Sequence, residues 1–287
     1  METGPGPIDA ANRAFIQDSA WLFETDRAAA VAMAPRSAHD DLITLAAYLG
    51  DVRRIPLTVS DATLGEIRLQ WWRDTLQAGV QGGLSGNPIA DGMVRVIARH
   101  ALPLASVLAP LEAASAELTG EPFEDEAAWL AYLDSAEGAG FRLSAATLGA
   151  PACSDSSPCF EPAGRAYATI RLAVRLPELL SRHRWPVPPQ LAEFGDPRSA
   201  SEADARAIVR QAGDALAADA AQYLEGARQA VAQSPRDVLP AIITAALVPS
   251  YAKAIVRPRR DALREPAQIA PLVRFLRLWW ASRTHKI

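Results

Sequence analysis

Apolar residues along this chain of 287 residues recur at intervals of three and four, the spacing that places them on one face of an α-helix. No segment alternates cleanly between apolar and polar residues, so the pattern gives no sign of a β-strand. The helices are expected at residues 9–33, 37–55, 60–79, 88–101, 103–118, 125–148, 164–181, 201–233, 240–256 and 267–282. A loop is expected at 151–162. The sequence therefore predicts an all-α fold.

The helix expected at 60–79 follows Ser60 and Asp61, residue types that cap helix N-termini. Its polar side is expected to contain Gln70, together with Glu66 and Asp74. The apolar side, which we expect to face the core, comprises Leu64, Ile67, Trp71 and Leu76. Adjacent residues of a helix point in different directions, so at least one of Trp71 and Trp72 is expected in the core, and Trp71 is the better candidate.

With 49% hydrophobic residues the chain can bury a substantial core, and no Gly/Ser-rich linker divides it. We therefore expect one domain at 20–287, preceded by an N-terminal extension at 1–19 that is partly disordered at its start. The net charge of −4 comes from interleaved acids and bases, which does not favour nucleic acid as a partner. The chain has only two lysines beside abundant Ala and Arg, a composition typical of GC-rich bacterial genomes.

The remaining composition favours a cytoplasmic protein. Cys153 and Cys159 lack the spacing of zinc ligands and are interpreted as loop thiols in a reducing compartment. No basic segment followed by an apolar run opens the chain, so no secretory signal is expected. The longest apolar stretch, at 239–256, contains prolines and polar residues and is shorter than the roughly 20 residues that span a bilayer. We expect a soluble protein, or one peripheral on the inner face of the membrane.

Two glycines interrupt the helix expected at 125–148, within the small-residue segment 136–140. Each costs about 1 kcal/mol relative to alanine inside a helix. Two explanations remain open: a neighbouring helix approaches the backbone closely, or the glycines line a ligand pocket.

Several segments, in this order, resemble the squalene/phytoene synthase family. They are the block at 45–74, the Y-x-x-x-A-E-G-A-G segment from Tyr132, the G-x-A-Y-x-x-x-R-L-x-x-x-L-P segment from Gly164, R-W-P-V-P from Arg184, and the tail from Leu247. Together they cover most of residues 20–282. The resemblance implies an isoprenoid-synthase-like helical bundle around a central cavity.

In active members of that family, two D-x-x-x-D motifs face each other across the cavity and hold Mg²⁺, which bridges to the substrate diphosphates. Hard cations such as Mg²⁺ take oxygen ligands, and carboxylates four residues apart lie on one helix face. Counted along the resembling segments, the first motif falls on residues 53–57, where its acids are replaced by Arg53 and Leu57. The second falls on 175–179, where they are replaced by Arg175 and Leu179. We therefore predict neither a metal site nor a cofactor.

This loss resembles a degenerate branch of the family, the phytoene-synthase-like assembly factors of respiratory complex I. The shared feature is the pattern V-S-x-x-x-L-G-x-I-R-x-Q-W-W, which starts at Val59 in this chain. The resemblance implies a protein that assists assembly of the respiratory chain, with an assembly partner from that complex or an isoprenoid-like lipid as its ligand.

The candidate residues of the cavity and its ligand site are Tyr48, Arg53, Arg54, Gln70, Tyr132, Gly138, Arg171 and Arg175. No catalytic residue is predicted. Arg53, Arg54 and Arg175 have two interpretations. They converge on the cavity and bind a phosphate or lipid head group without a metal, or they pair with Asp51, Glu66 or Glu178 or point to solvent.

The C-terminal helix contains Trp279 and Trp280 among basic residues. Such a helix suits an anionic membrane surface. The alternative is ordinary docking on the core, with basic residues that complement the dipole at the helix end.

Two functions compete. The first is a non-catalytic scaffold that binds an assembly partner or an isoprenoid-like lipid; a weaker variant is a lipid carrier that acts without a partner. The second is an active prenyltransferase that joins two prenyl diphosphates head to head, and only this alternative requires Mg²⁺. The absence of the acidic motifs favours the first.

Overall fold

The computed structural model describes residues 9–149 and 158–287 and contains helices, with no strand in those two ranges. In chain order the α-helices are α1 (Ala10–Phe23), α2 (Thr25–Ala30), α3 (His39–Arg53), α4 (Ile55–Thr58), α5 (Ala62–Val80), α6 (Pro88–His100), α7 (Leu104–Thr119), α8 (Glu126–Leu133), α9 (Ala139–Thr147), α10 (Phe160–Leu180), α11 (Pro189–Ala192), α12 (Glu202–Ala232), α13 (Leu239–Ile242), α14 (Val248–Ile255) and α15 (Pro271–Thr284). The all-α prediction is confirmed.

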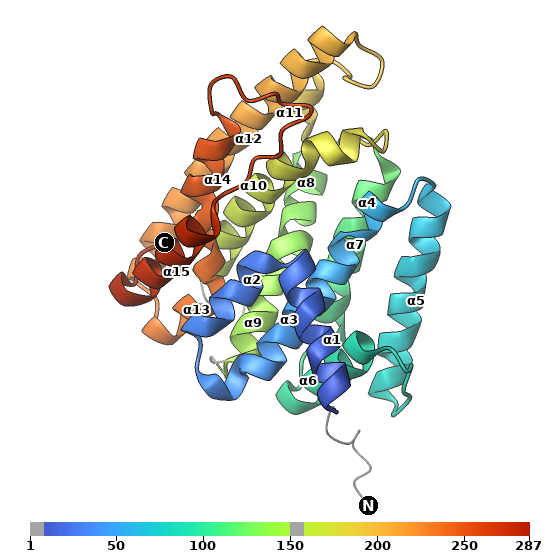
Figure 1. The fold of residues 1–287 in the computed structure, drawn as a ribbon, viewed down its shortest axis with the longest axis vertical. Helices are drawn as coiled ribbons and strands as arrows, with labels where there is room; N and C mark the ends of the chain where they lie inside the picture. The colour runs from blue at the N-terminus through green and yellow to red at the C-terminus, as the bar shows by residue number, and fades with distance from the viewer. Residues whose placement is uncertain (1–8, 150–157) are drawn as a thin grey trace, which may run out of the picture.

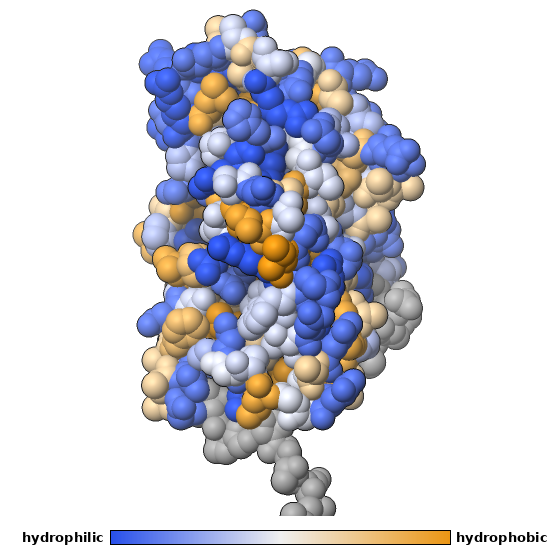
Figure 2. Space-filling view, turned by 90° about the vertical axis from the view of Figure 1, so that its right-hand side faces the viewer, coloured by the Kyte–Doolittle hydropathy of each residue, from blue (hydrophilic) through white to orange (hydrophobic). Residues whose placement is uncertain are grey.

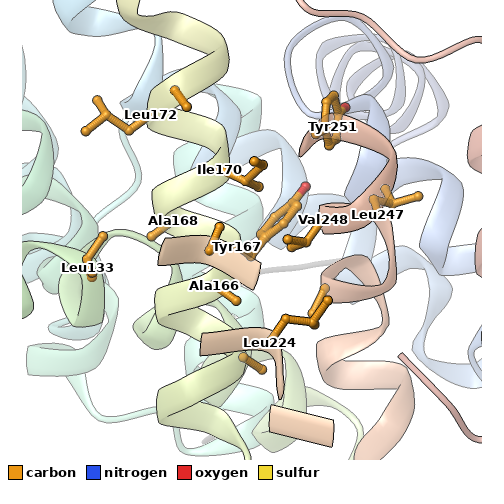
Figure 3. Close-up of a cluster of buried hydrophobic side chains, with 14 of the residues drawn as sticks. Leu133, Ala166, Tyr167, Ala168, Ile170, Leu172, Leu224, Leu247, Val248 and Tyr251 are labelled. Atoms are coloured by element: carbon orange, nitrogen blue, oxygen red, sulfur yellow. The ribbon is translucent and has the colours of Figure 1, made fainter. Parts of the chain in front are cut away.

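The helices form two adjoining hydrophobic cores. One lies among α3, α5, α6 and α7, and the other surrounds α10, which packs against α12 and α14. α5 forms one outer edge of the molecule, while α12, α14 and α15 lie on the opposite side (Figure 1). In the second core, Tyr167 and Ile170 of α10 lie opposite Val248 and Tyr251 of α14, and the hydroxyl of Tyr167 points towards Tyr251 (Figure 3). The cavity that the family resemblance implies lies between the two cores, where α3, α7 and α10 meet.

The predicted helix at 9–33 is broken at Glu24, whose φ of −140° and ψ of 48° leave the helical region. α1 ends at Phe23, α2 begins at Thr25, and a short 3₁₀ turn, Val31–Met33, follows. The boundary expected at residue 20 falls inside α1, where Ile16 is in the core. Residues 1–8, the start of the predicted extension, are not among the described residues.

Other predicted helix limits are partly confirmed. Asp61, Asp125 and Ser201 cap α5, α8 and α12 through their side chains. The helix at 125–148 is continuous but contains a π-helical segment, Asp134–Gly138, between α8 and α9. The helix at 240–256 is divided into α13 and α14 by a 3₁₀ turn, Ile243–Leu247. α13 and α14 each have a proline in their first turn, where its missing N–H does no harm.

The predicted core face of α5 is confirmed at Leu76 and wrong at the other three residues, and of the two tryptophans it is Trp72 that lies in the core. Trp72 is only 2% exposed, whereas Trp71 is 42% exposed and Leu64 and Ile67 also face solvent. The buried side comprises Gly65, Leu69, Trp72, Leu76 and Gly79. A Cβ on Gly65 would meet Leu118 of α7 at 2.5 Å, and one on Gly79 would meet Val94 of α6 at 2.2 Å. Both glycines lie where α5 contacts α7 and α6. Because glycine has no apolar side chain, the pattern of apolar residues alone indicated the wrong side of the helix.

The stretch of 20 residues Arg236–Ile255 is, among the described residues, the one long and apolar enough to cross a membrane by length and composition. Two thirds of its most apolar window is buried inside the fold, and it is divided between α13, a 3₁₀ turn and α14. We therefore interpret it as part of the second core. Cys159 lies in the turn that immediately precedes α10, and its side chain is buried in the same core; Cys153 lies outside the described residues.

Candidate functional site

Four of the eight candidate residues line one cavity between the two cores: Arg53 from the end of α3, Tyr132 from α8, and Arg171 and Arg175 from α10. Glu117 of α7 and Glu137 of the π-helical segment complete its polar wall. Arg53 and Arg175, which the family resemblance places at the leading positions of the two motifs, therefore face the same space. Arg175 Nη2 donates to the backbone carbonyl oxygen of Arg53 at 3.0 Å.

Two buried glutamates, Glu137 in the cavity wall and Glu24 behind the wall on the same arginines, are each 1% exposed. Arg53 donates to both, through Nη1 to Glu24 and through Nη2 to Glu137 at 2.6 Å. Arg171 binds both oxygens of Glu24, with Nη2 at 3.1 Å. Arg27 Nη2 donates to Glu137 at 2.5 Å, and its Nε lies 3.3 Å from Glu24. Three guanidinium groups thus surround two carboxylates; we call these five residues the central ion cluster.

A second buried pair adjoins the central ion cluster. Arg175 makes a bidentate contact with Glu117, at 2.7 and 3.1 Å. The Tyr132 hydroxyl donates to the same carboxylate at 2.8 Å. Burial, followed by the charge of Glu117, raises the pKa of Tyr132 well above its usual value, so this hydroxyl keeps its proton and remains a donor.

Asp26 connects the central ion cluster to the C-terminal helix. Its carboxylate accepts hydrogen bonds from the hydroxyls of Tyr167 and Tyr251, each at 2.8 Å, and from Arg274 Nε of α15 at 2.5 Å. The Tyr167 hydroxyl also accepts from Arg171 Nη1 at 3.2 Å. A continuous chain of polar contacts therefore runs from α15 to Glu24.

The charges of the arginines control the protonation of Glu24. Burial alone raises the pKa of this carboxyl, but the charges of Arg171, Arg53 and Arg27 outweigh burial and lower the pKa from 4.5 to about 2. Glu24 is therefore ionised at neutral pH, as three adjacent guanidinium groups require.

This lowered pKa predicts a loss of stability in acid. A carboxyl whose pKa is lower in the folded than in the unfolded chain stabilises the fold fully above its unfolded pKa, and this contribution is lost as the pH falls through the folded pKa. We expect the contribution of Glu24 to the free energy of unfolding to disappear between pH 4.5 and about 2. Urea denaturation across this range, with a carboxyl ¹³C titration of Glu24, measures both quantities; a Glu24 midpoint near 4.5 would contradict the prediction.

The other four candidate residues lie away from the cavity wall. The Tyr48 side chain is buried in the first core and donates to the backbone oxygen of Val107 at 2.6 Å. Arg54 pairs with Asp51 at 2.8 Å and covers the ring of Phe23, which agrees with the second interpretation of this arginine.

Gln70 lies on the exposed side of α5, bonded to Asp74 at 2.7 Å, so its place is the surface and not the cavity. Gly138 touches α10, because a Cβ on Gly164 would lie 2.6 Å from the Gly138 Cα. The close approach of the two helices therefore requires glycine at 164, whereas a Cβ on Gly138 would make only ordinary contacts, with Arg142 at 3.4 Å and Asp134 at 3.8 Å.

Sequence reasoning missed four acids of the site: Glu24, Asp26, Glu117 and Glu137. Neither interpretation of Arg53 and Arg175 named their glutamate partners. A signal was available in the helical spacing. Glu24 is four residues from Ala20, and Glu137 is four residues from both Leu133 and Phe141, all of which are buried. An acidic residue spaced four residues from buried apolar residues lies on the same buried side of the helix. Its charge is then buried as well and requires a partner.

The donor set of this cavity does not fit Mg²⁺. The described residues contain no group of three or more His, Cys, Asp or Glu side chains arranged to hold a metal ion. Glu24, Glu117 and Glu137 all bind guanidinium groups, and Leu57 and Leu179 provide no oxygen. Glu178, the one carboxylate of the second motif, is exposed on the outer side of α10. A divalent cation here would need to displace arginines from buried carboxylates.

The fold belongs to a known class of all-helical proteins. It is similar to the crystal structure of a dehydrosqualene synthase in complex with ligand, with a TM-score of 0.76, 12% sequence identity and 96% of each chain covered. It is also similar to squalene synthase HpnC from Alicyclobacillus acidocaldarius, with a TM-score of 0.66 and 17% identity, covering 89% of this chain and 95% of that one. This is the all-α fold of squalene and phytoene synthases.

The sequence agrees with the fold. The model of the squalene/phytoene synthase family matches residues 23–273, and the chain belongs to this family. No curated protein matches the chain.

Proposed function

We propose that this protein is a non-catalytic member of the squalene/phytoene synthase family. The observation that supports the proposal most directly is the central ion cluster. Arginines stand at the leading positions of both acidic motifs and neutralise the buried glutamates of the cavity. Expulsion of a diphosphate requires its growing negative charge to be balanced, usually by metal ions, and here the carboxylates that would retain those ions are already paired.

The size of the cavity supports the same proposal. The cavity has a volume of only about 20 Å³, which is room for about one water molecule. Sites for small organic ligands commonly enclose about 300–1,000 Å³. Neither two prenyl diphosphates nor one isoprenoid-like lipid fits without separation of α3, α7 and α10, so binding of a partner protein through the surface is the favoured mode of action.

We infer that its role is in assembly of the respiratory chain, specifically of complex I. This inference rests on the block at 59–72 that resembles the assembly-factor branch. Leu64, Ile67 and Trp71 of this block are exposed on α5 and spaced by three and four residues. Figure 2 faces the side on which α5 lies and shows orange patches among blue polar residues. Such a row suits contact with a partner protein, since paired helices commonly use this spacing.

Magnesium is expected to leave the protein unaffected. Any ligand that binds the native state raises the melting temperature by mass action. Because we expect no magnesium site, addition of about 5 mM MgCl₂, alone or with farnesyl diphosphate, should leave the melting temperature unchanged within about 1 °C. Radiolabelled farnesyl or geranylgeranyl diphosphate incubated with Mg²⁺ should give no squalene, phytoene or presqualene diphosphate. Product formation together with stabilisation by Mg²⁺ would refute the proposal and favour the prenyltransferase alternative.

The cellular role is tested by deletion of the gene, with complex I assembly measured beside carotenoid and hopanoid content. Loss of assembled complex I with unchanged isoprenoids supports the proposed role. Intact complex I with depleted isoprenoids overturns it. The same strain complemented with a Leu64→Ser, Ile67→Ser variant tests the surface directly, because both side chains are exposed on α5 and their replacement leaves the buried ion pairs intact.

A further inference from the structure

The C-terminal helix α15 lies against the rest of the molecule through a narrow side. Leu278 and Ala281 are its buried residues, and it packs on the 3₁₀ turn Ile243–Leu247 and on α2. The helix lies at the outer edge of the molecule (Figure 1). Six of its large apolar side chains are at least 40% exposed: Leu272, Val273, Phe275, Leu276, Trp279 and Trp280. A soluble monomer rarely exposes so contiguous an apolar surface without a use for it.

The exposed apolar residues share one side of the helix. With about 100° of rotation per residue, residues 272, 275, 276 and 279 lie together, and residues 273 and 280 extend the same arc to about 160°. Leu278 and Ala281 lie on the opposite side, facing the core. We call this exposed arc the apolar face of α15. Its orientation is the reverse of an ordinary surface helix, which directs its wide apolar side inward.

Positive charge surrounds the apolar face. Arg277, Arg283 and Lys286 are exposed, and no Asp or Glu occurs between residues 266 and 287. The guanidinium of Arg283 lies 5.7 Å from the centre of the Trp279 ring. Long basic side chains at the edge of an apolar surface can extend their charges to lipid phosphates while their stems remain among apolar groups.

α15 is held in a fixed orientation. Arg274, on its inner side, is bound to Asp26, which also accepts hydrogen bonds from Tyr167 and Tyr251. The apolar face is therefore presented by a helix fastened to the buried centre of the fold. With 14 residues the helix is about 21 Å long, too short for the roughly 30 Å of a hydrocarbon core.

We propose that α15 docks flat on the surface of an anionic lipid bilayer, with its apolar face in the interfacial layer and Arg277, Arg283 and Lys286 among the lipid phosphates. Charge complementarity selects this occupant. A second copy of the chain would place the same cations against each other, which is unfavourable. The combination of Trp, Phe and Leu with basic residues and no acids is the composition of helices that lie in the membrane interface. This inference is independent of whether the cavity catalyses a reaction.

Flotation of the full chain with lipid vesicles tests the proposal. The protein should float with phosphatidylcholine vesicles that contain phosphatidylglycerol, much less with pure phosphatidylcholine, and less as salt screens the charges. The double variant Phe275→Ser, Trp280→Ser should reduce partition about tenfold or more. Replacement of Arg277 and Lys286 by Gln should weaken it about fivefold per charge. All these side chains are exposed, so the melting temperature should remain unchanged and serves as the folding control.

The matched control is Leu64→Ser, Ile67→Ser on α5, where two apolar residues are similarly exposed but the neighbouring charges are mixed, with Glu66 and Asp74 beside Arg68. This variant should float like the unaltered chain. Failure of the unaltered chain to float with anionic vesicles would overturn the proposal, as would a loss caused by the α5 variant alone. Sedimentation that shows a dimer, converted to monomer by the α15 variant, would instead assign the face to a second copy and also overturn it.

Discussion

Replacement of Glu24 by alanine is expected to lower the free energy of unfolding by about 3–5 kcal/mol, the usual cost of removing one partner of a buried ion pair. The carboxylate accepts from Arg53 and Arg171 and lies beside Arg27. Its removal leaves three buried guanidinium groups to share Glu137. Urea denaturation followed by circular dichroism measures the change.

Two further variants show whether charge or packing is responsible. Glu121→Gln removes a carboxylate that pairs with Arg198 at the surface and should cost about 1 kcal/mol or less. Glu24→Gln combined with Arg171→Met removes both members of a pair and should cost less than the sum of the single changes, because neighbouring charges are coupled. A Glu24→Ala variant as stable as Glu121→Gln would show that the central ion cluster does not support the fold.

The second large effect is expected at Gly164, where α10 crosses the π-helical segment. A Cβ there would lie 2.6 Å from the Gly138 Cα and 2.9 Å from its nitrogen. Because both atoms are backbone, no side chain can turn aside and the two helices must separate. We expect Gly164→Ala to destabilise the protein by about 1–3 kcal/mol, the range for overpacked cores. Thermal unfolding would show this as a lower melting temperature.

Gly226→Ala, within α12, is the matched control, and it is expected to change the stability in the opposite direction. Its added Cβ would lie 3.7 Å from Pro162, an ordinary contact. Alanine should therefore stabilise the helix by about 0.5–1 kcal/mol through its higher helix propensity. If Gly164→Ala also stabilised the protein, the close approach of α10 to the π-helical segment would be incorrect.

Helix positions could be predicted from the sequence because they depend on local features. The capping residues Asp61, Asp125 and Ser201 each bind a backbone N–H in the first turn of their helix, and this is a short-range interaction. The family resemblance added the cavity and the positions of Arg53 and Arg175 in its wall, which residue patterns alone could not supply.

The errors arise from interactions between distant segments. The orientation of α5 depends on Leu118 and Val94, which fill the space above Gly65 and Gly79, and the sequence of the helix does not contain that information. Glu24 and Glu137 are separated by more than a hundred residues from each other, and both are bridged by Arg53. Spacing along the chain can indicate that each glutamate is buried, but only the fold shows that they share one arginine.

The central ion cluster also limits which single substitutions the chain tolerates. A change of Arg53 to aspartate would place a third carboxylate between Glu24 and Glu137, where like charges repel in a poorly solvated interior. Such a variant would be less stable than the present protein. Conversion of this cluster into a cation site would therefore require several simultaneous substitutions.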